Sequence, residues 1–243
     1  MSRRRPPPRR RAPKEGAEFK AGVRAAFAGL IDAEPMLSSD MVAALPLPAE
    51  PRHDEQRFVL QGVPWWTYVA LRDALDNHAG LKLTYLEGTL ELMSPSMLHE
   101  DAKKIIARLL EAWATETRVD LRGFGSTTFR REARQRGLEP DECYKLGKLQ
   151  EDAVPDIAVE VVVSSGTVDK MSVYAGLGVA EVWVWRPSAA AIEVNRLIDG
   201  AYQRRERSEV LPALDLAELA RFVQPGENQT ELVRAYQAVL RGH

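Results

Sequence analysis

Glu160 stands inside the most apolar stretch of the chain, the run DIAVEVVVS at residues 156–164. An ionised carboxylate is costly inside a buried strand unless it is paired with a cation or binds a metal ion. This placement makes Glu160 the first candidate for a functional site. The alternative is an ordinary glutamate that faces an edge of the sheet or forms a salt bridge.

Asp141 is the expected partner of Glu160. Asp156 shares a strand face with Glu160, but four residues of a strand span about 13 Å, too far for one magnesium ion with ligands at about 2.1 Å. If the strands that contain Asp141 and Glu160 pair as a hairpin, their carboxylates converge across about 5 Å of sheet. Glu142 points to the opposite face and is a poorer candidate. The spacing therefore predicts a pair of carboxylates that could hold a divalent cation.

Lys170 is the third candidate residue. It lies in the first turn of the helix expected at residues 168–177 and ended by Gly178, where the helix dipole does not favour a positive charge. A cation beside an attacking water helps the hydrolysis of a metal-bound phosphoester, which gives this lysine a chemical role. The alternative is a surface lysine without a role.

The elements that would position these residues follow a mixed order of helices and strands. Apolar residues recur at helical spacing between residues 102 and 113. Three strands are expected next, at 123–132, 141–146 and 156–164, then the short helix and a strand at 181–187. The strand at 156–164 is β-branched on both faces, which predicts a central strand covered on both sides. The order helix, three strands, helix, strand (αβββαβ) predicts an α/β fold of the α+β kind with a mixed sheet.

Further elements flank this core. Residues 1–18 read as a disordered basic tail rich in Pro and Arg, and residues 19–56 as an accessory helix with a Pro-rich connector. The compact domain is expected at residues 57–243. It would begin with a strand at 58–63, a helix at 64–77 and a hairpin at 81–95, and end with a hairpin at 191–206 and helices at 214–223 and 229–242.

Composition excludes several classes of protein. A hydrophobic share of 45% and a charged share of 28% are typical of a globular domain, and no apolar run is long enough to cross a bilayer. The single Cys143 excludes an internal disulfide, and the basic start lacks the apolar segment of a secretory signal, so we expect a cytoplasmic location. The four His residues are too few and scattered for structural zinc. The usual glycine-rich nucleotide-binding signatures are absent.

Charge is distributed unevenly. The first 14 residues carry seven Arg and Lys and no acid, and removing those seven leaves 26 basic against 35 acidic residues, a net charge of −9. An acidic body argues against strong nonspecific duplex binding by the folded part alone. The tail could contact phosphates, or it could only keep the protein soluble.

Three stretches carry a resemblance to a known family. They are YLEGTLELMSPSMLHEDAKK, FGSTTFRREARQRGLEPDECYKLG and PDIAVEVVVSSGTVDKMSVYAGLGVAEVWVWR. Together they resemble the Uma-type restriction endonuclease family of the PD-(D/E)XK nuclease superfamily, over roughly residues 57–239. The resemblance implies a restriction-endonuclease-like core with additions at both ends.

The resemblance also implies roles for individual residues. Asp141 after Pro140 is similar to the PD of the superfamily and Glu160 to its (D/E), with the main-chain carbonyl of Val161 as a further ligand for Mg²⁺ or Mn²⁺. Val162 stands where the superfamily has its usual lysine, and Lys170 from the following helix matches the residue that takes over. Of these assignments, that of Lys170 rests mainly on the resemblance.

Two more positions match the family. Glu87, before Gly88, could be an extra ligand of the metal or of water, and His99 could lie near the site at the start of a helix. For both residues a structural role is the equal alternative, since Glu87-Gly88 is also simply a hairpin turn.

These observations predict a divalent-metal-dependent endonuclease that hydrolyses phosphodiester bonds, with DNA as the expected substrate. The alternative is a catalytically inactive nucleic-acid-binding or scaffold protein with the same fold, which Val162 and the acidic body favour. An RNA-cleaving enzyme has no positive support, because no RNA-reading aromatic motif is present. Superfamily nucleases that cut both strands are often dimers, so a homodimer is compatible with the resemblance.

Overall fold

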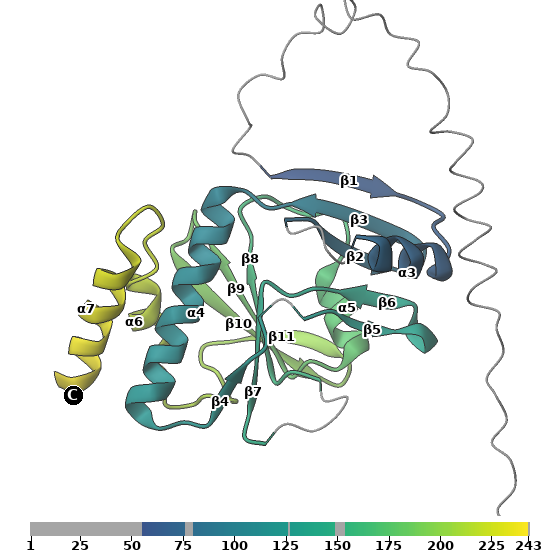
Figure 1. Ribbon diagram of the computed structural model, residues 1–243. Helices are drawn as coiled ribbons and strands as arrows, with labels where there is room; N and C mark the ends of the chain where they lie inside the picture. The colour runs from purple at the N-terminus through teal and green to yellow at the C-terminus, as the bar shows by residue number, and fades with distance from the viewer. Residues whose placement is uncertain (1–54, 76–79, 126, 149–153, 243) are drawn as a thin grey trace, which may run out of the picture. The chain divides into compact units, whose positions relative to one another are not determined.

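The computed structural model describes residues 55–75, 80–125, 127–148 and 154–242 (Figure 1). These residues belong to one compact unit, Arg52–His243. The basic tail predicted at 1–18 and nearly all of the connector predicted at 19–56 lie outside the described residues. Within the described part of the chain, no helix is long and apolar enough to span a membrane.

The described strands form two sheets. The first sheet is antiparallel, with the order β1-β3-β2-β6-β5. The second has the order β11-β10-β9-β8-β7-β4 and is antiparallel except for the parallel pair β8–β9. The strands of the first sheet are β1 (Gln56–Leu60), β2 (Lys82–Leu86), β3 (Thr89–Ser94), β5 (Phe129–Arg131) and β6 (Arg136–Leu138). Those of the second are β4 (Leu121–Gly123), β7 (Glu142–Leu146), β8 (Ile157–Val161), β9 (Glu181–Arg186), β10 (Ala191–Ile198) and β11 (Ala201–Arg205).

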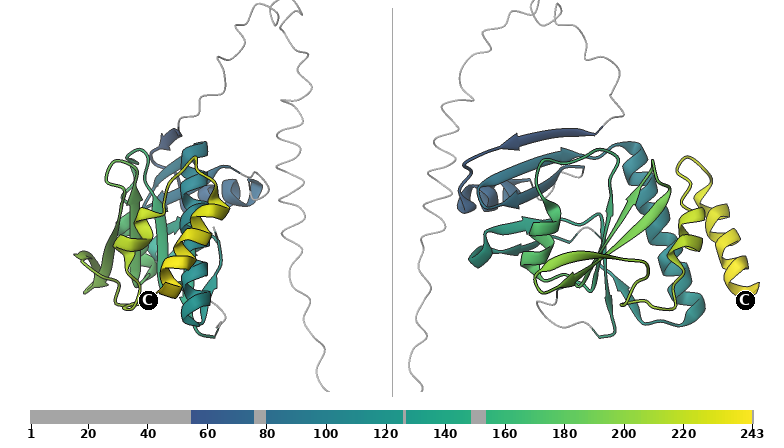
Figure 2. Two further views of the ribbon diagram at one scale, coloured as in Figure 1. Left: turned by 90° about the vertical axis from the view of Figure 1, so that its left-hand side faces the viewer. Right: turned by 180° about the vertical axis from the view of Figure 1, so that it is seen from behind.

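The described helices lie beside these sheets (Figure 2). They are α3 (Trp65–Ala74), α4 (Met97–Thr117), α5 (Lys170–Leu177), α6 (Leu216–Arg221) and α7 (Gln229–Gly242), with a 3₁₀ turn, η1, at Glu132–Arg134. The Ser96 side chain caps α4 by accepting a hydrogen bond from the N–H of His99. Helix α5 ends at Gly178, whose positive φ of 86° closes the helix as the sequence predicts.

The mixed α+β fold is confirmed: α4, β4, β7, β8, α5 and β9 occur in the order αβββαβ, with β5, η1 and β6 of the first sheet inserted between β4 and β7. The prediction of a single strand at 123–132 is wrong. That stretch contains the end of β4 in one sheet and β5 in the other. Gly125 lies between the two strands, and its φ of +58° is a conformation that favours glycine and ends a regular strand.

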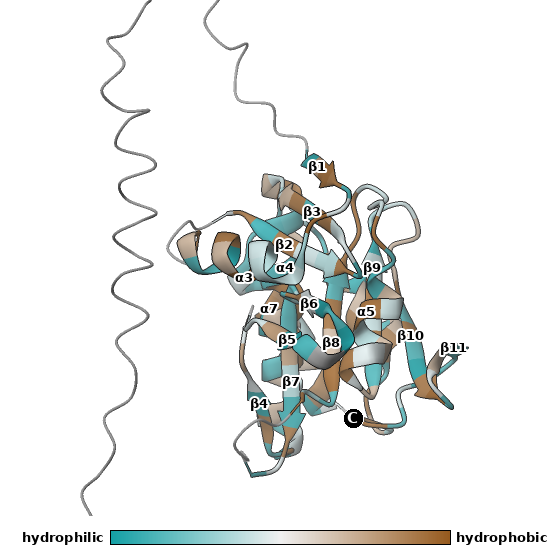
Figure 3. Ribbon diagram, turned by 90° about the vertical axis from the view of Figure 1, so that its right-hand side faces the viewer, coloured by the Kyte–Doolittle hydropathy of each residue, from teal (hydrophilic) through white to brown (hydrophobic). Residues whose placement is uncertain are grey.

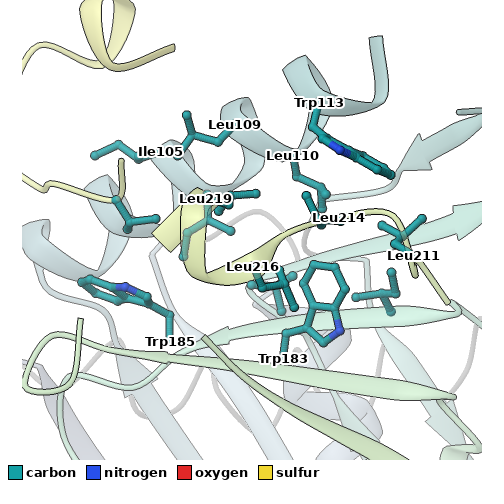
Figure 4. Close-up of a cluster of buried hydrophobic side chains, with 14 of the residues drawn as sticks. Ile105, Leu109, Leu110, Trp113, Trp183, Trp185, Leu211, Leu214, Leu216 and Leu219 are labelled. Atoms are coloured by element: carbon teal, nitrogen blue, oxygen red, sulfur yellow. The ribbon is translucent and has the colours of Figure 1, made fainter. Parts of the chain in front are cut away.

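Strand β8 is buried along its whole length, as its β-branched residues predict. Ile157, Val159 and Val161 pack on one face into a core formed with α4, α6 and α7, parts of which Figure 4 shows between Trp183 and the leucines of α4. Ala158 packs on the other face into a second core around α5. Glu160 points to this second face, so α5 covers the strand side that carries the candidate carboxylate.

Hairpin turns and registers set the positions of the candidate residues. Glu87 (φ 46°) and Gly88 (φ 94°) join β2 to β3 with the two positive φ angles of a tight hairpin turn, as predicted. Strands β7 and β8 pair antiparallel with Glu142 opposite Val159. One step further along this register, Asp141 stands opposite Glu160.

Candidate active site

Glu160 lies near the end of β8 with only 2% of its surface exposed. One carboxylate oxygen, Oε2, accepts a hydrogen bond of 2.7 Å from Nζ of Lys170 at the start of α5. The other oxygen accepts a hydrogen bond from the hydroxyl of Tyr174, one turn further along α5. The short helix thus supplies a cation and a neutral donor to the same carboxylate.

Asp141 is fully buried beside Glu160. Its Oδ2 accepts a hydrogen bond of 2.7 Å from the main-chain N–H of Val161. Its Oδ1 contacts Nζ of Lys82, on β2 of the other sheet, and lies 2.9 Å from Nε2 of His99 in the first turn of α4. Three elements therefore converge on this carboxylate.

The charges and hydrogen bonds around Asp141 favour its ionised form. Burial by itself raises the pKa of Asp141, but the positive charge of Lys82 and the hydrogen bond from His99 outweigh it and hold the pKa far below its usual range. Burial likewise opposes the charge of Lys170, and the neighbouring Glu160 and Asp141 outweigh it and raise its pKa. Burial and the charge of Glu160 raise the pKa of Tyr174 well above its usual value, so Tyr174 acts only as a proton donor in its hydrogen bond.

His99 extends the network away from the two carboxylates. Its Nδ1 lies 2.8 Å from Oε1 of Glu55, and Glu55 in turn forms a 3.0 Å ion pair with Arg57. Burial lowers the pKa of His99, but hydrogen bonds to Asp141 and Glu55 outweigh it and raise the pKa to about 9. Burial raises the pKa of Glu55, but hydrogen bonds from His99, Ser164 and Arg57 lower it to about 2. His99 is therefore a cation at neutral pH, held between two anions.

A pocket of about 220 Å³ opens beside Glu160 and Lys170. It lies where β8 and β9 end and α5 begins, and Tyr174 and the loop residues Ser164 and Ser165 also line it. In open sheets, ligands bind at the carboxyl ends of parallel strands. Glu160 and Lys170 therefore both border a pocket at the ends of these two strands.

The structure brings together Asp141, Glu160, Lys170 and His99, but not every residue that the sequence singled out. Glu87 lies in the β2–β3 turn with its side chain 63% exposed and pairs with Arg136 at 2.9 Å. None of its described contacts is with the two carboxylates, so the structure favours the turn role over the ligand role.

Asp156 and Glu142 likewise lie apart from the site. Asp156 accepts a hydrogen bond from the N–H of Leu146 and pairs with Lys145, which anchors the entry to β8, as the strand geometry predicts. Glu142 is buried on the opposite face of β7, where burial raises its pKa and Lys104 is the largest charge that offsets this effect.

Sequence reasoning missed Lys82 and Tyr174. Lys82 lies in the run LKLTYL, where a lysine inside a strand pattern is a weak signal of a buried charge. Its partner Asp141 is 59 residues away in sequence and belongs to the other sheet, so the contact depends on how the sheets pack. Tyr174 follows Lys170 at the i+4 spacing that places two side chains on one helix face, and this spacing could have identified it.

The donors at the site fit a hard divalent cation in kind. Magnesium binds carboxylate oxygens and keeps several waters, so two carboxylates with water and a substrate phosphate are sufficient. Within the described ranges no group of three His, Cys, Asp or Glu side chains is arranged to hold a metal ion. Asp141 and Glu160 would hold the ion together with the main-chain carbonyl of Val161. The ammonium groups of Lys82 and Lys170 now contact the two carboxylates and would have to move away from the oxygens that bind the ion.

The family model of Uma2, described as "Putative restriction endonuclease", matches residues 65–226 of this chain. The match spans 162 of the 243 residues and contains Asp141, Glu160 and Lys170. The chain belongs to the Uma2 family.

One solved structure that this chain resembles is described as a "putative nuclease belonging to DUF820" from Anabaena variabilis ATCC 29413. The sequences are 14% identical, and the similarity covers 64% of this chain and 90% of that chain with a TM-score of 0.40. No curated protein matches this chain.

Proposed function

We propose that this protein is a divalent-metal-dependent endonuclease that hydrolyses phosphodiester bonds of DNA. The observation that carries the proposal is the pair of buried carboxylates, Asp141 directly before β7 and Glu160 on β8, with a lysine beside each. Membership in the Uma2 family supports the class of activity. The metal is inferred from the chemistry of the donors, and the DNA substrate from the description of the family as a restriction endonuclease.

Asp141, Glu160 and the main-chain carbonyl of Val161 would hold Mg²⁺ or Mn²⁺. When bound, such an ion polarises a phosphate and lowers the pKa of a coordinated water toward neutrality. The 2.7 Å hydrogen bond from the N–H of Val161 fixes the orientation of the Asp141 carboxylate. The hydroxyl of Tyr174 fixes that of Glu160 in the same way.

Lys170 would serve as the catalytic cation. Its ammonium lies at the pocket and against Glu160, where it can orient an attacking water and stabilise negative charge that develops on the phosphate. Glu160 and Asp141 raise the pKa of Lys170, which favours its charged form beside the two carboxylates.

The proposal is tested by incubating the full chain with plasmid, linear and single-stranded DNA and with RNA, with Mg²⁺, Mn²⁺ or EDTA. We expect cleavage of DNA that requires the metal and is lost in Glu160→Gln, while circular dichroism shows an intact fold. Metal-dependent cleavage that survives in Glu160→Gln would exclude this site.

A DNA-binding or scaffold protein without cleavage activity is the second candidate. It is favoured by Asp141, because this carboxylate is fully buried and both of its oxygens already have partners among the described residues. The two candidates differ in one measurable property, since only the nuclease needs a divalent ion at the Asp141–Glu160 pair.

A further inference from the structure

The pocket beside Glu160 contains three positively charged side chains, and two of them are already neutralised. Arg57 pairs with Glu55 at 3.0 Å and with Glu91 at 2.7 Å. Lys170 pairs with Glu160 at 2.7 Å. The third cation is Arg186, the last residue of β9.

Arg186 differs from the other two in its partners. Its Nη1 atom is buried and has no hydrogen-bond partner among the described residues. A buried donor on a charged group is destabilising when it lacks a partner, because it has lost its water without gaining an acceptor. Such a group in a native protein calls for an explanation, and a bound anion or water is one that its chemistry allows. The guanidinium at the pocket is therefore suited to an anion from outside the chain.

The register of the sheet places Arg186 close to the two carboxylates. Val184 of β9 stands opposite Glu160 of β8 in the parallel pair. Arg186 follows two residues later on the same face, and Val182, Val184 and Arg186 all line the pocket. Diagonal neighbours on adjacent strands are about 7–8 Å apart at their Cα atoms, within the reach of an arginine side chain. Figure 3 shows α5 packed against the second sheet, to which β8 and β9 belong.

We propose that Arg186 binds a backbone phosphate of a nucleic-acid strand. This phosphate is the neighbour of the phosphodiester bond that lies at Glu160 and Lys170. A guanidinium presents paired N–H donors that match two phosphate oxygens, which a lysine ammonium does not. The identity of the anion rests on the proposed function, whereas the presence of an anion site rests on the pocket and on Arg186 alone. Arg186 is then a residue that binds and positions the substrate.

Fluorescence anisotropy of a short fluorescein-labelled single-stranded DNA oligonucleotide, titrated with the full chain in EDTA, tests the proposal without cleavage. We expect Arg186→Gln to weaken binding about tenfold, because it removes a charge-assisted phosphate contact. The slope of log affinity against log salt should fall by about 0.7, the share of one phosphate contact with a single strand. Arg186→Lys should keep this slope and lose part of the affinity.

Arg204→Gln is the matched control. Arg204 lies on β11 with its side chain 72% exposed, pairs with Glu193 and does not line the pocket, yet the substitution removes the same charge. Binding by Arg204→Gln should equal that of the wild type. Equal affinity and slope for Arg186→Gln and Arg204→Gln would overturn the proposal, as would a wild-type protein that does not bind the oligonucleotide.

Thermal unfolding separates binding from folding. Because Arg186 has an unpartnered buried nitrogen, Arg186→Gln should unfold at the wild-type temperature or above it. A lower unfolding temperature together with weaker binding would assign Arg186 a structural role and overturn the proposal.

The outcome is also distinct from that of the nuclease proposal. Loss of affinity in Arg186→Gln without any metal-dependent cleavage by the wild type would leave the phosphate site standing and refute the nuclease. Cleavage that depends on Glu160, with unchanged binding in Arg186→Gln, would refute the phosphate site and leave the nuclease proposal standing.

Discussion

Replacing Lys82 by Met should reduce the stability of the fold strongly, because Lys82 is an ion-pair partner of the buried Asp141. The ammonium contacts the fully buried Asp141 carboxylate, and the two side chains are 9% and 0% exposed. Breaking a buried ion pair by removing one partner costs about 3–5 kcal/mol, because the other charge is left without compensation. His99 remains beside Asp141 after the substitution. We therefore expect a loss near the lower end, about 3 kcal/mol of unfolding free energy.

Urea unfolding of wild type, Lys82→Met, Asp141→Asn and the double variant measures this interaction as a double-mutant cycle. The expected coupling energy is about 2 kcal/mol. The double variant should therefore lose clearly less unfolding free energy than the two single variants lose together. Lys145→Met is the matched control, since Lys145 pairs with Asp156 at 3.2 Å but the side chains are 17% and 30% exposed. Such an exposed pair contributes about 1 kcal/mol or less. Equal losses in the two lysine variants would refute the idea that Lys82 neutralises a buried charge.

Three further predictions follow from other buried groups. Glu181 accepts hydrogen bonds from Trp183, from Ser208 and from two main-chain N–H groups of the loop before α6. Glu181→Ala should therefore cost about 3 kcal/mol of unfolding free energy, measured with urea. A loss below about 1 kcal/mol would contradict this role. Burial raises the pKa of Cys143 to about 12. A thiol reagent at pH 8 should therefore label Cys143 slowly in the native protein and rapidly in denaturant. Fast labelling of the native protein would contradict the burial. The folded state lowers the pKa of Glu55 from 4.5 to about 2, so its contribution to stability is present above pH 4.5 and is lost as the pH falls toward 2. Glu55→Gln should flatten stability over that interval, and an unchanged acid profile would argue against the His99–Glu55–Arg57 contacts.

The Asp141–Glu160 pair could be predicted because its determinants are local. One apolar β-branched run identifies β8, and the short connection back to β7 favours an antiparallel hairpin in which Asp141 comes opposite Glu160. Strand geometry alone was enough to reject Asp156 as a second ligand, and the structure pairs that residue with Lys145. Periodicity and the cap at Gly178 likewise place Lys170 at the start of a short helix beside β8.

The rest of the site depends on packing between the two sheets. Lys82 reaches Asp141 from β2, and Glu55 reaches His99 from the residue before β1, so neither contact has a pattern in the sequence. The prediction of one strand at 123–132 fails for the same reason, because alternation cannot show that a chain leaves one sheet and enters another. Glu87 shows that a family motif can also single out a residue that lies away from the site. Its position in the β2–β3 hairpin turn and its pair with Arg136 account for it.

Binding of Mn²⁺ measured by isothermal titration calorimetry tests the central claim most directly. The wild type should bind the ion saturably, and the isosteric variants Asp141→Asn and Glu160→Gln should each lose most of that affinity. Asp156→Asn, which removes a carboxylate at the other end of β8 that pairs with Lys145, should bind as the wild type does. Absence of binding to the wild type, or undiminished binding to both site variants, would contradict a metal centre at Asp141 and Glu160.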